Sequence, residues 1–393
     1  MRKFVSVILI TTILFSICAC ANVSSGDNEI DKHFIKSVNN FSYDTAQVLL
    51  KDKTDNFNYS PVSLYYALAV AGRGASGETQ QQIFHLLNVS SEKKLSAQCG
   101  ELYKLLYSDN KISKLKIANS LWLNENKKFN DSFVSNAENH YHLSTFSVDF
   151  SDEDTEKAMA KWISENTNGT LIPNLEINPT QNLSIINTIY FCDEWTNNFN
   201  KESTKKEAFH TEKGDVKADF MHKTDTMDFV IGENYMRSSL DLKGDGQMVF
   251  ILPDEGVTVS DLLSSRHSMK ALFEEGKEHF GSVKWEIPKY NFYTQCSLKD
   301  VLNTMGMTNA FEAKADFSGI TQEKTSISEV LQQTQIAIDE NGVEASAFTK
   351  IDMYSAAHPE ESAEMILNRP FIYGIASSNG TLIFVGVCNN PSV

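Results

Sequence analysis

Residues 339–354 read DENGVEASAFTKIDMY, an unusual composition for a regular element. Asn341-Gly342 is a turn signal, and the residues after it can be sorted onto two faces by alternation. One face then carries Val343, Ala345, Ala347, Thr349, Ile351 and Met353. The opposite face carries Glu344, Ser346, Phe348, Lys350, Asp352 and Tyr354. Such alternation is typical of a strand with one buried and one solvated face.

The small residues on the buried face weaken this strand assignment. Alanine is a poor strand former, so an alanine-rich stretch is also compatible with helix or coil. The residues that follow, 355–361, read SAAHPEE and are polar and loop-like. We therefore expect a segment that can become a strand without being committed to that structure. An ordinary edge strand followed by a loop is the alternative.

Along the rest of the chain, the sequence patterns change from those typical of helices to those typical of strands. Ser60-Pro61 predicts a helix start, because proline suits the first helical turn. Short runs rich in branched and aromatic residues predict strands at 183–191, 247–252 and 382–387. No linker, repeat or low-complexity block follows the N-terminal region. Helices first and strands later favour an α+β fold, with one domain over residues 32–393.

Composition and charge exclude several classes of function. The chain is 41% hydrophobic and 22% charged, an ordinary globular mixture, and its formal net charge is −16. So acidic a surface repels phosphate backbones, so we expect no nucleic-acid partner. The sequence contains no nucleophile elbow, phosphate loop or zinc-ligand spacing. We therefore expect no cofactor and no metal, and the absence of motifs argues against an enzyme.

The N-terminus has the layout of an export signal. Arg2 and Lys3 precede an uncharged, mostly apolar run over residues 4–21. This run contains Ala19-Cys20, which resembles the bacterial lipobox, so Cys20 is the expected lipidation site. We expect a signal peptide at 1–19 and the lipidated cysteine with its tether at 20–31. A plain secretory leader and a retained membrane anchor are the alternatives.

This reading predicts a protein outside the cytoplasm, anchored by lipid to a bacterial membrane, at the outer membrane or cell surface. Secretion is the alternative. Four further cysteines are too sparse for a disulfide framework, although one disulfide among them stays open. They are Cys99, Cys192, Cys296 and Cys388.

Residues 339–349 resemble the proximal hinge of the serpin reactive-centre loop, in which an acidic residue, a glycine and a glutamate precede a run of small residues. Further motifs in family order support the resemblance over nearly all of residues 32–393. They are 56–63 (NFNYSPVS), 74–79 (GASGET), 167–169 (TNG), 187–191 (NTIYF) with Trp195 and Phe199, 306–311 (GMTNAF), 315–320 (ADFSGI), 368–371 (NRPF), 384–386 (FVG) and 390–391 (NP).

The resemblance implies a serpin fold, with an N-terminal helical region, three β-sheets and an exposed loop. It implies a monomeric serine-protease inhibitor, not an enzyme, that traps a serine or cysteine protease as a covalent acyl-enzyme. The cleaved loop inserts into sheet A as a new strand and carries the protease with it. The hinge residues implied are Glu340, Gly342, Val343, Glu344, Ala345, Ser346, Ala347 and Thr349. The shutter and breach residues implied are Ser60, Ser63, Asn187 and Trp195.

The family's spacing, counted from Glu340, places the scissile bond between Ala356 and Ala357. A shift of two or three positions would instead involve Met353, Tyr354 or Ser355. Small alanines suit an elastase-like or subtilisin-like protease, whereas tyrosine or methionine suits a chymotrypsin-like or papain-like one. Because the loop contains no arginine, we expect little inhibition of trypsin or thrombin.

The chain departs from the family pattern at four places. Val343 replaces the usual threonine or serine, Phe348 is bulky, and Gln332 stands where the shutter often has histidine. Residues 192–194 (CDE) replace a basic, glycine-containing stretch. These departures affect the expected rate of insertion rather than the fold. A serpin-fold binder, carrier or chaperone that does not inhibit is the alternative function.

Overall fold

The computed structural model describes residues 30–171, 173, 175, 177–264, 269–327, 330–343 and 361–392. The expected lipidation site, Cys20, lies outside this part of the chain. So does most of the expected loop: Glu344, Ala345, Ser346, Ala347, Thr349, Met353, Tyr354, Ser355, Ala356 and Ala357. In the described ranges, no helix is both long and apolar enough to cross a membrane.

Helices dominate the first part of the described chain. Their bounds are α1 Lys32–Leu50, α2 Pro61–Gly74, α3 Gly77–Leu86, α4 Glu92–Leu106, α5 Asp131–Tyr141 and α6 Glu153–Asn166, followed later by α7 Val259–Ser264, α8 Met269–Glu274 and α9 Lys299–Thr304. The helix start predicted at Ser60-Pro61 is confirmed. The Ser60 hydroxyl accepts a hydrogen bond from the Ser63 amide as N-cap of α2, and Pro61 occupies the first turn.

One sheet contains the strands that matter for the site. Its order is β11-β12-β13-β5-β3-β2, and β4 pairs with residues 119–124 of β3. The bounds are β2 Ser108–Asp109, β3 Lys114–Asn124, β4 Leu143–Val148, β5 Leu183–Glu194, β11 Tyr290–Ser297, β12 Leu331–Ile338 and β13 Gly342–Val343. The strand predicted at 183–191 is therefore confirmed and extends to Glu194.

The remaining strands form a second hydrogen-bonded path in the order β1-β16-β15-β9-β8-β7-β10-β14, with β6 paired to β7. Their bounds are β1 Phe57–Tyr59, β6 Lys205–Thr211, β7 Gly214–Ile231, β8 Tyr235–Asp241, β9 Gln247–Pro253, β10 Lys277–Pro288, β14 Ser362–Ile366, β15 Phe371–Ala376 and β16 Leu382–Cys388. The resemblance implied three β-sheets, but the long strand β7 pairs with β6, β8 and β10 and so joins these described strands into one path.

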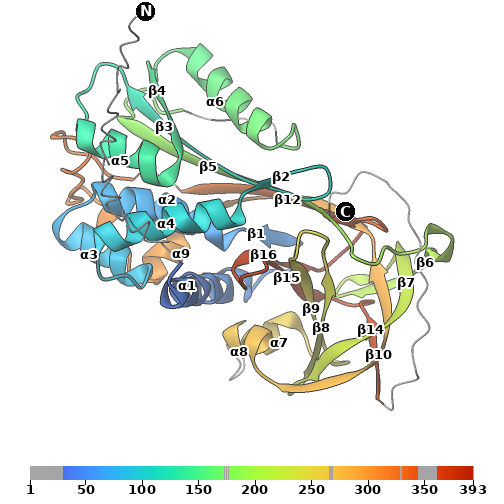
Figure 1. Cartoon of the computed structure of the whole chain (residues 1–393). Coiled ribbons are helices and arrows are strands. Elements are labelled where there is room, and N and C mark those ends of the chain that lie inside the picture. Colours follow the sequence, from blue (N-terminus) through green and yellow to red (C-terminus); the bar gives the residue numbers. More distant parts are fainter. Residues whose placement is uncertain are drawn as a thin grey trace, which may run out of the picture.

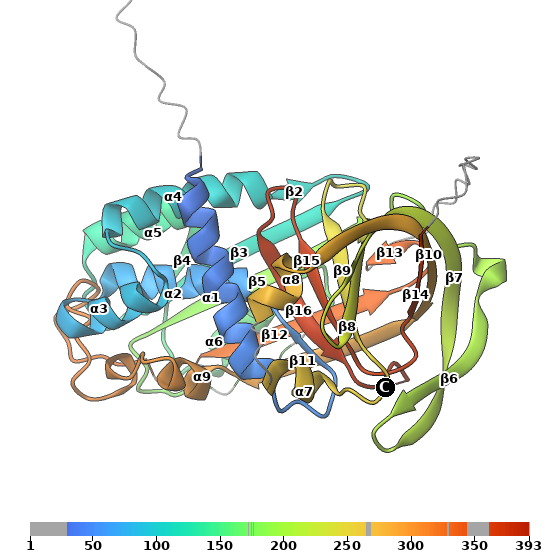
Figure 2. The same cartoon turned by 90° about the horizontal axis from the view of Figure 1, so that it is seen from below.

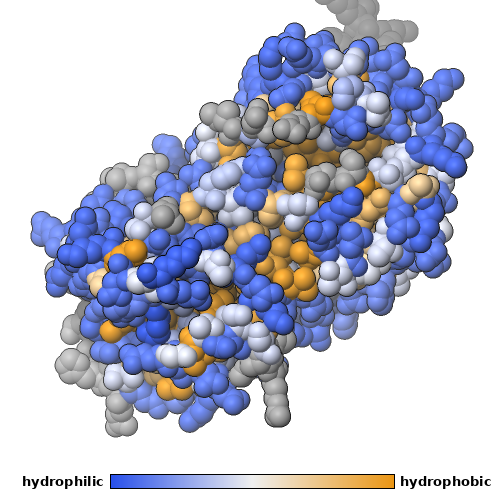
Figure 3. All heavy atoms as spheres, turned by 180° about the vertical axis from the view of Figure 1, so that it is seen from behind, coloured by the Kyte–Doolittle hydropathy of each residue, from blue (hydrophilic) through white to orange (hydrophobic). Residues whose placement is uncertain are grey.

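The sheet that carries β3 and β5 separates helix α6 from the helices around α2 (Figure 1). The view from below shows α1 lying beside β16, at one side of the second path (Figure 2). From behind, the surface is mostly hydrophilic, with apolar side chains visible in a hollow (Figure 3). The expected α+β architecture is confirmed, and its buried core includes Trp195 and Trp285 at 0% exposure.

Candidate functional site

The first residues of the expected hinge are already seated in the sheet. Gly342 and Val343 form β13, between β12 and β5 and antiparallel to both. Gly342 pairs with Glu194, while Val343 pairs with Asp193 on one side and Ile338 on the other. The Val343 side chain is 2% exposed. The apolar residue predicted to face inwards therefore does so at this position.

Below β13 the two neighbouring strands are separated. Because β12 and β5 are each antiparallel to β13, they run in the same direction as each other. Within the described residues, no ladder pairs β12 directly with β5; we call the gap between them the seam. A chain continued from Val343 in the direction of β13 would run along this seam and meet a strand on each side.

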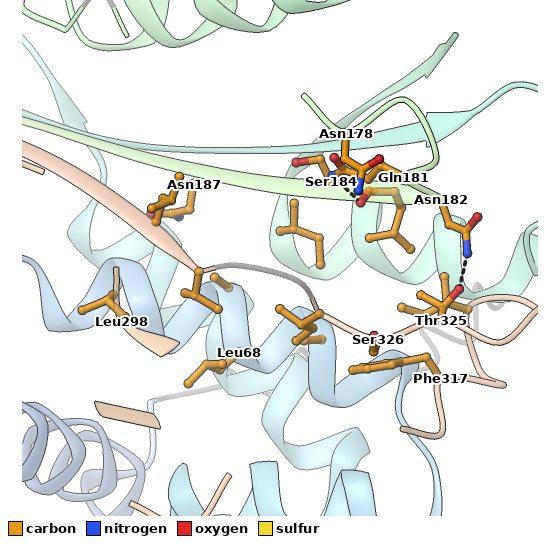
Figure 4. A pocket seen from close by; sticks show the side chains of 18 of the residues that line it. Leu68, Asn178, Gln181, Asn182, Ser184, Asn187, Leu298, Phe317, Thr325 and Ser326 are labelled. Carbon is orange, nitrogen blue, oxygen red and sulfur yellow. Dashed lines mark hydrogen bonds between the residues drawn. The ribbon is translucent and has the colours of Figure 1, made fainter. Parts of the chain in front are cut away.

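The lower end of the seam opens into a cavity of about 370 Å³ (Figure 4). Leu64 and Leu68 of α2 line its apolar floor, and Ser184 and Asn187 of β5 line one side. Gln332 of β12 contributes on the other side. The cavity therefore provides polar and apolar surface where an added strand would end.

The upper end of the seam is closed by Trp195 and its neighbours. The Trp195 indole N–H donates to the Asp339 carbonyl at 2.9 Å, and its backbone amide donates to the Asn341 carbonyl at 2.9 Å. The Phe199 amide donates to the Glu340 carbonyl at 3.0 Å. These bonds fix the turn that leads from β12 into β13.

Glu340 anchors the same turn through its side chain. Its carboxylate lies 2.9 Å from the Lys289 ammonium and accepts a 2.7 Å hydrogen bond from the Thr204 hydroxyl. Burial alone would raise the pKa of this carboxyl, but the two hydrogen bonds hold the pKa below its ordinary value. The acid is therefore ionised at neutral pH and ties the turn to the strands behind it.

Gly342 occupies a position that no other residue fits without movement. A Cβ atom added there would lie 2.1 Å from the Asp193 carbonyl oxygen, far inside van der Waals contact. The backbone of β5 approaches closely because the hinge glycine has no side chain. The glycine predicted for the hinge thus has a packing reason in this structure.

The expected shutter residues come together beneath the seam. Gln332 makes two bonds to the Ser60 backbone: its carbonyl accepts from the amide at 2.8 Å, and its amide donates to the carbonyl at 2.9 Å. The Ser63 hydroxyl donates to Asn187, and Asn187 donates in turn to Asn119. These bonds link β12 through the start of α2 to β5 and β3. Gln332 therefore connects β12 to the other shutter residues through the backbone of Ser60.

Residues 192–194 include two acidic side chains whose burial and contacts the sequence pattern did not predict. Asp193 and Glu194 are 1% and 8% exposed, although both are acidic. In the sequence, two acidic residues stand directly before Trp195, just after the strand predicted at 183–191, and this position could have drawn attention to them. Their partners, which come from distant turns, were not visible in the sequence.

The cysteines and possible metal ligands can also be compared with the expectations from the sequence. Within the residues that the structure describes, Cys99, Cys192, Cys296 and Cys388 form no disulfide. Burial raises the pKa of Cys99 and Cys388 far above the ordinary thiol value, which keeps these sulfurs protonated. No group of three or more His, Cys, Asp or Glu side chains suited to a metal occurs in the part of the chain that the structure describes.

Comparison with known proteins identifies the family. The model of the family described as serpin (serine protease inhibitor) matches residues 36–391. The chain belongs to the serpin family. It is 31% identical to an uncharacterized serpin-like protein of the archaeon Methanosarcina acetivorans, over 93% of this chain and 88% of that protein.

Solved serpin structures confirm the fold. Tengpin, a thermophilic serpin in its native state, is 30% identical and superposes with a TM-score of 0.83, over 92% of this chain and 95% of that chain. Thyroxine-binding globulin in complex with thyroxine superposes with a TM-score of 0.80 at 23% identity, over 92% of this chain and all of that chain. The second likeness concerns the fold alone.

Proposed function

We propose that this serpin inhibits a serine or cysteine protease by covalent trapping. The observation that carries the proposal is the seated hinge: Gly342 and Val343 already occupy the first two positions of a strand at the top of the seam. Each further loop residue could pair with β12 on one side and β5 on the other. Residues 344–355 contain no proline, which would interrupt such a ladder.

The proposed mechanism starts with attack of the protease on the loop bond between Ala356 and Ala357, with Met353, Tyr354 and Ser355 as the other candidates. The acyl-enzyme forms, and the freed loop inserts along the seam. About twelve residues in a strand span roughly 40 Å, which moves the bound protease to the far end of the sheet. Its acylated serine is then displaced from the base and oxyanion hole, whose placement controls deacylation.

The expected targets follow from the loop sequence. Alanines at 356 and 357 suit elastase-like and subtilisin-like proteases, and Tyr354 or Met353 suits a chymotrypsin-like or papain-like protease. Incubation with pancreatic elastase, followed by denaturing electrophoresis, tests the proposal. We expect a complex that survives SDS, with a mass near the sum of the two proteins. Complete loop cleavage without any such complex would favour a binder or carrier.

We also propose that Cys20 carries a lipid and that residues 20–31 tether the domain to a bacterial membrane. Cys20→Ala should move the protein from the membrane fraction to the soluble fraction, because two or more acyl chains supply the anchor, at about 0.8 kcal/mol per buried CH₂. Immunoblotting of the two fractions measures the change, with Cys18→Ala as the matched control. Membrane retention of Cys20→Ala would contradict the lipid anchor and leave a retained apolar segment.

A further inference from the structure

The described chain begins beside helix α4. The Asp31 amide donates to the Gln98 side chain at 2.7 Å, and the Asp31 carboxylate lies 2.8 Å from the Lys94 ammonium. Both partners lie on α4, and Figure 2 shows the start of α1 next to that helix. The proposed tether, residues 20–31, therefore joins the domain at α4.

Exposed apolar side chains begin on the same side of α4. Leu105 lies two helical turns after Gln98, about 10 Å further along the helix, and is 51% exposed. Tyr107 and Ile112 follow at 43% and 46% exposure. The chain runs from α4 directly into β2 along one edge of the molecule (Figure 2). Single exposed apolar residues are ordinary, but three within eight consecutive residues mark a candidate interaction surface.

Lysines surround these apolar side chains. Residues 93–116 contain six lysines and two acidic residues, so this segment has a net charge of +4 in a chain of −16. Lys104 and Lys116 pair with neighbouring carboxylates at 3.0 and 2.8 Å. Lys111 and Lys114 form no salt bridge among the side chains that the structure describes. We call the following six residues the tether-side surface: Lys104, Leu105, Tyr107, Lys111, Ile112 and Lys114.

Ring stacking holds Tyr107 at this surface. Its ring stacks on Tyr103 with centroids 5.6 Å apart, and Tyr103 in turn stacks on His142 at 4.2 Å. A tyrosine has an apolar ring and a polar tip, which suits the boundary between membrane and water. Lysines attract anionic headgroups. Together, lysines and exposed apolar side chains are the composition of a surface that lies on an anionic membrane.

We propose that the tether-side surface rests on anionic lipid headgroups of the membrane to which the chain is tethered. This inference rests on the proposed tether. Residues 20–29 separate the expected lipid from the described chain, and ten residues reach at most about 35 Å. The tether-side surface starts about 10 Å from the place where this segment joins α4. The membrane is therefore within reach of this surface whenever the tether is not fully extended.

The acidic character of the whole chain does not prevent this contact. At physiological ionic strength, charges are largely screened beyond about 8 Å. The headgroups therefore interact mainly with the charges that they touch, and on this surface those are lysines. A domain that is acidic elsewhere would be oriented on an anionic membrane, because its other faces are repelled at close approach.

Lysine acetylation of the full, membrane-bound chain tests the contact. The chain is sedimented on vesicles of phosphatidylcholine alone, and on vesicles in which phosphatidylglycerol replaces part of that lipid. Each lysine at an anionic surface contributes about fivefold to binding. We therefore expect Lys104 and Lys111 to be acetylated at least about fivefold more slowly on the anionic vesicles. Lys213, exposed in the β6–β7 turn, is the internal control and should react equally on both.

Three variants make the result specific. Ile112→Ser removes an exposed apolar side chain, and Lys111→Glu reverses a charge, so each should reduce the protection of Lys104. Ile231→Ser is the matched control, because Ile231 is 52% exposed but lies on β7, away from α4 (Figure 1). It should keep the wild-type protection. All three side chains are exposed, so each variant should fold.

Equal acetylation of Lys104 and Lys111 on the two kinds of vesicle would overturn the proposal. Wild-type protection of Lys104 in both Ile112→Ser and Lys111→Glu would overturn it as well. Sedimentation separates these results from failure of the tether, since a chain without an anchor would not sediment with the neutral vesicles. Sedimentation and protection on the anionic vesicles alone would then still support the tether-side surface, and loss of both would overturn it.

Discussion

With Val343→Arg, we expect a protease to cleave the loop and leave without being trapped. Val343 is 2% exposed between β12 and β5, so a guanidinium there would lose water without gaining a partner. An uncompensated buried charge costs about 3–5 kcal/mol. Insertion and deacylation compete, and a barrier raised by even ~1.4 kcal/mol slows insertion tenfold. The number of inhibitor molecules consumed per trapped protease equals one plus the ratio of the deacylation rate to the insertion rate, so it should rise as that ratio increases at least about tenfold.

The matched control for this variant is Val343→Thr. Threonine has the same branched shape, and its hydroxyl can bond to a nearby carbonyl, so its cost should be smaller. Titration of elastase activity against increasing inhibitor measures the stoichiometry for both variants. The rate of loop cleavage should be unchanged in both, since Val343 is far along the chain from Ala356. Equal stoichiometry for the arginine variant and the wild type would contradict insertion at this position.

Trp195→Ala should produce the largest loss of stability. The indole is fully buried, and it packs edge-on against Phe199 with ring centroids 6.2 Å apart. Its N–H also bonds to the Asp339 carbonyl. Removing a buried tryptophan side chain costs about 3–5 kcal/mol. We expect the free energy of unfolding to fall by this amount in urea titrations followed by circular dichroism.

Trp195→Phe separates packing from hydrogen bonding at the same position. Phenylalanine keeps an aromatic ring near Phe199 but loses the bond to Asp339, so it should cost about 1 kcal/mol from the bond plus a smaller packing loss. Hydrogen exchange at Asn341 and Gly342 should increase in both variants, more strongly in the alanine variant. If the two variants lose equal stability, the indole contributes mainly through its hydrogen bond.

Local patterns predicted the elements of this fold well. Branched and aromatic runs at 183–191, 247–252 and 382–387 became β5, β9 and β16. The turn signal Asn341-Gly342 is also a turn in the structure, where the Asp339 carboxylate accepts from both amides. These strands and this turn depend on residues that are neighbours in the sequence, so the local residue types are enough to predict them.

The parts that could not be predicted depend on contacts between distant segments. Nothing near Asp193 indicates that Ser113 and Gly244 would surround it. The way Gln332 bonds to the Ser60 backbone follows from the position of α2 beneath the seam. The continuous path through β7 likewise follows from tertiary pairing. Hinge residues Glu340, Gly342 and Val343 were named through family resemblance, because their own alternation also fitted an edge strand.

Because the short strand β13 is already paired, insertion of the loop would extend an existing strand rather than nucleate a new one. Adding a strand to a sheet is slow to begin, because the chain must lose loop-closure entropy before any ladder exists. Here the turn from Ile338 to Val343 is already closed, and both neighbouring strands already hold the first residues. Each later residue would extend two ladders from an existing end. Insertion of the loop would then proceed residue by residue from one fixed register.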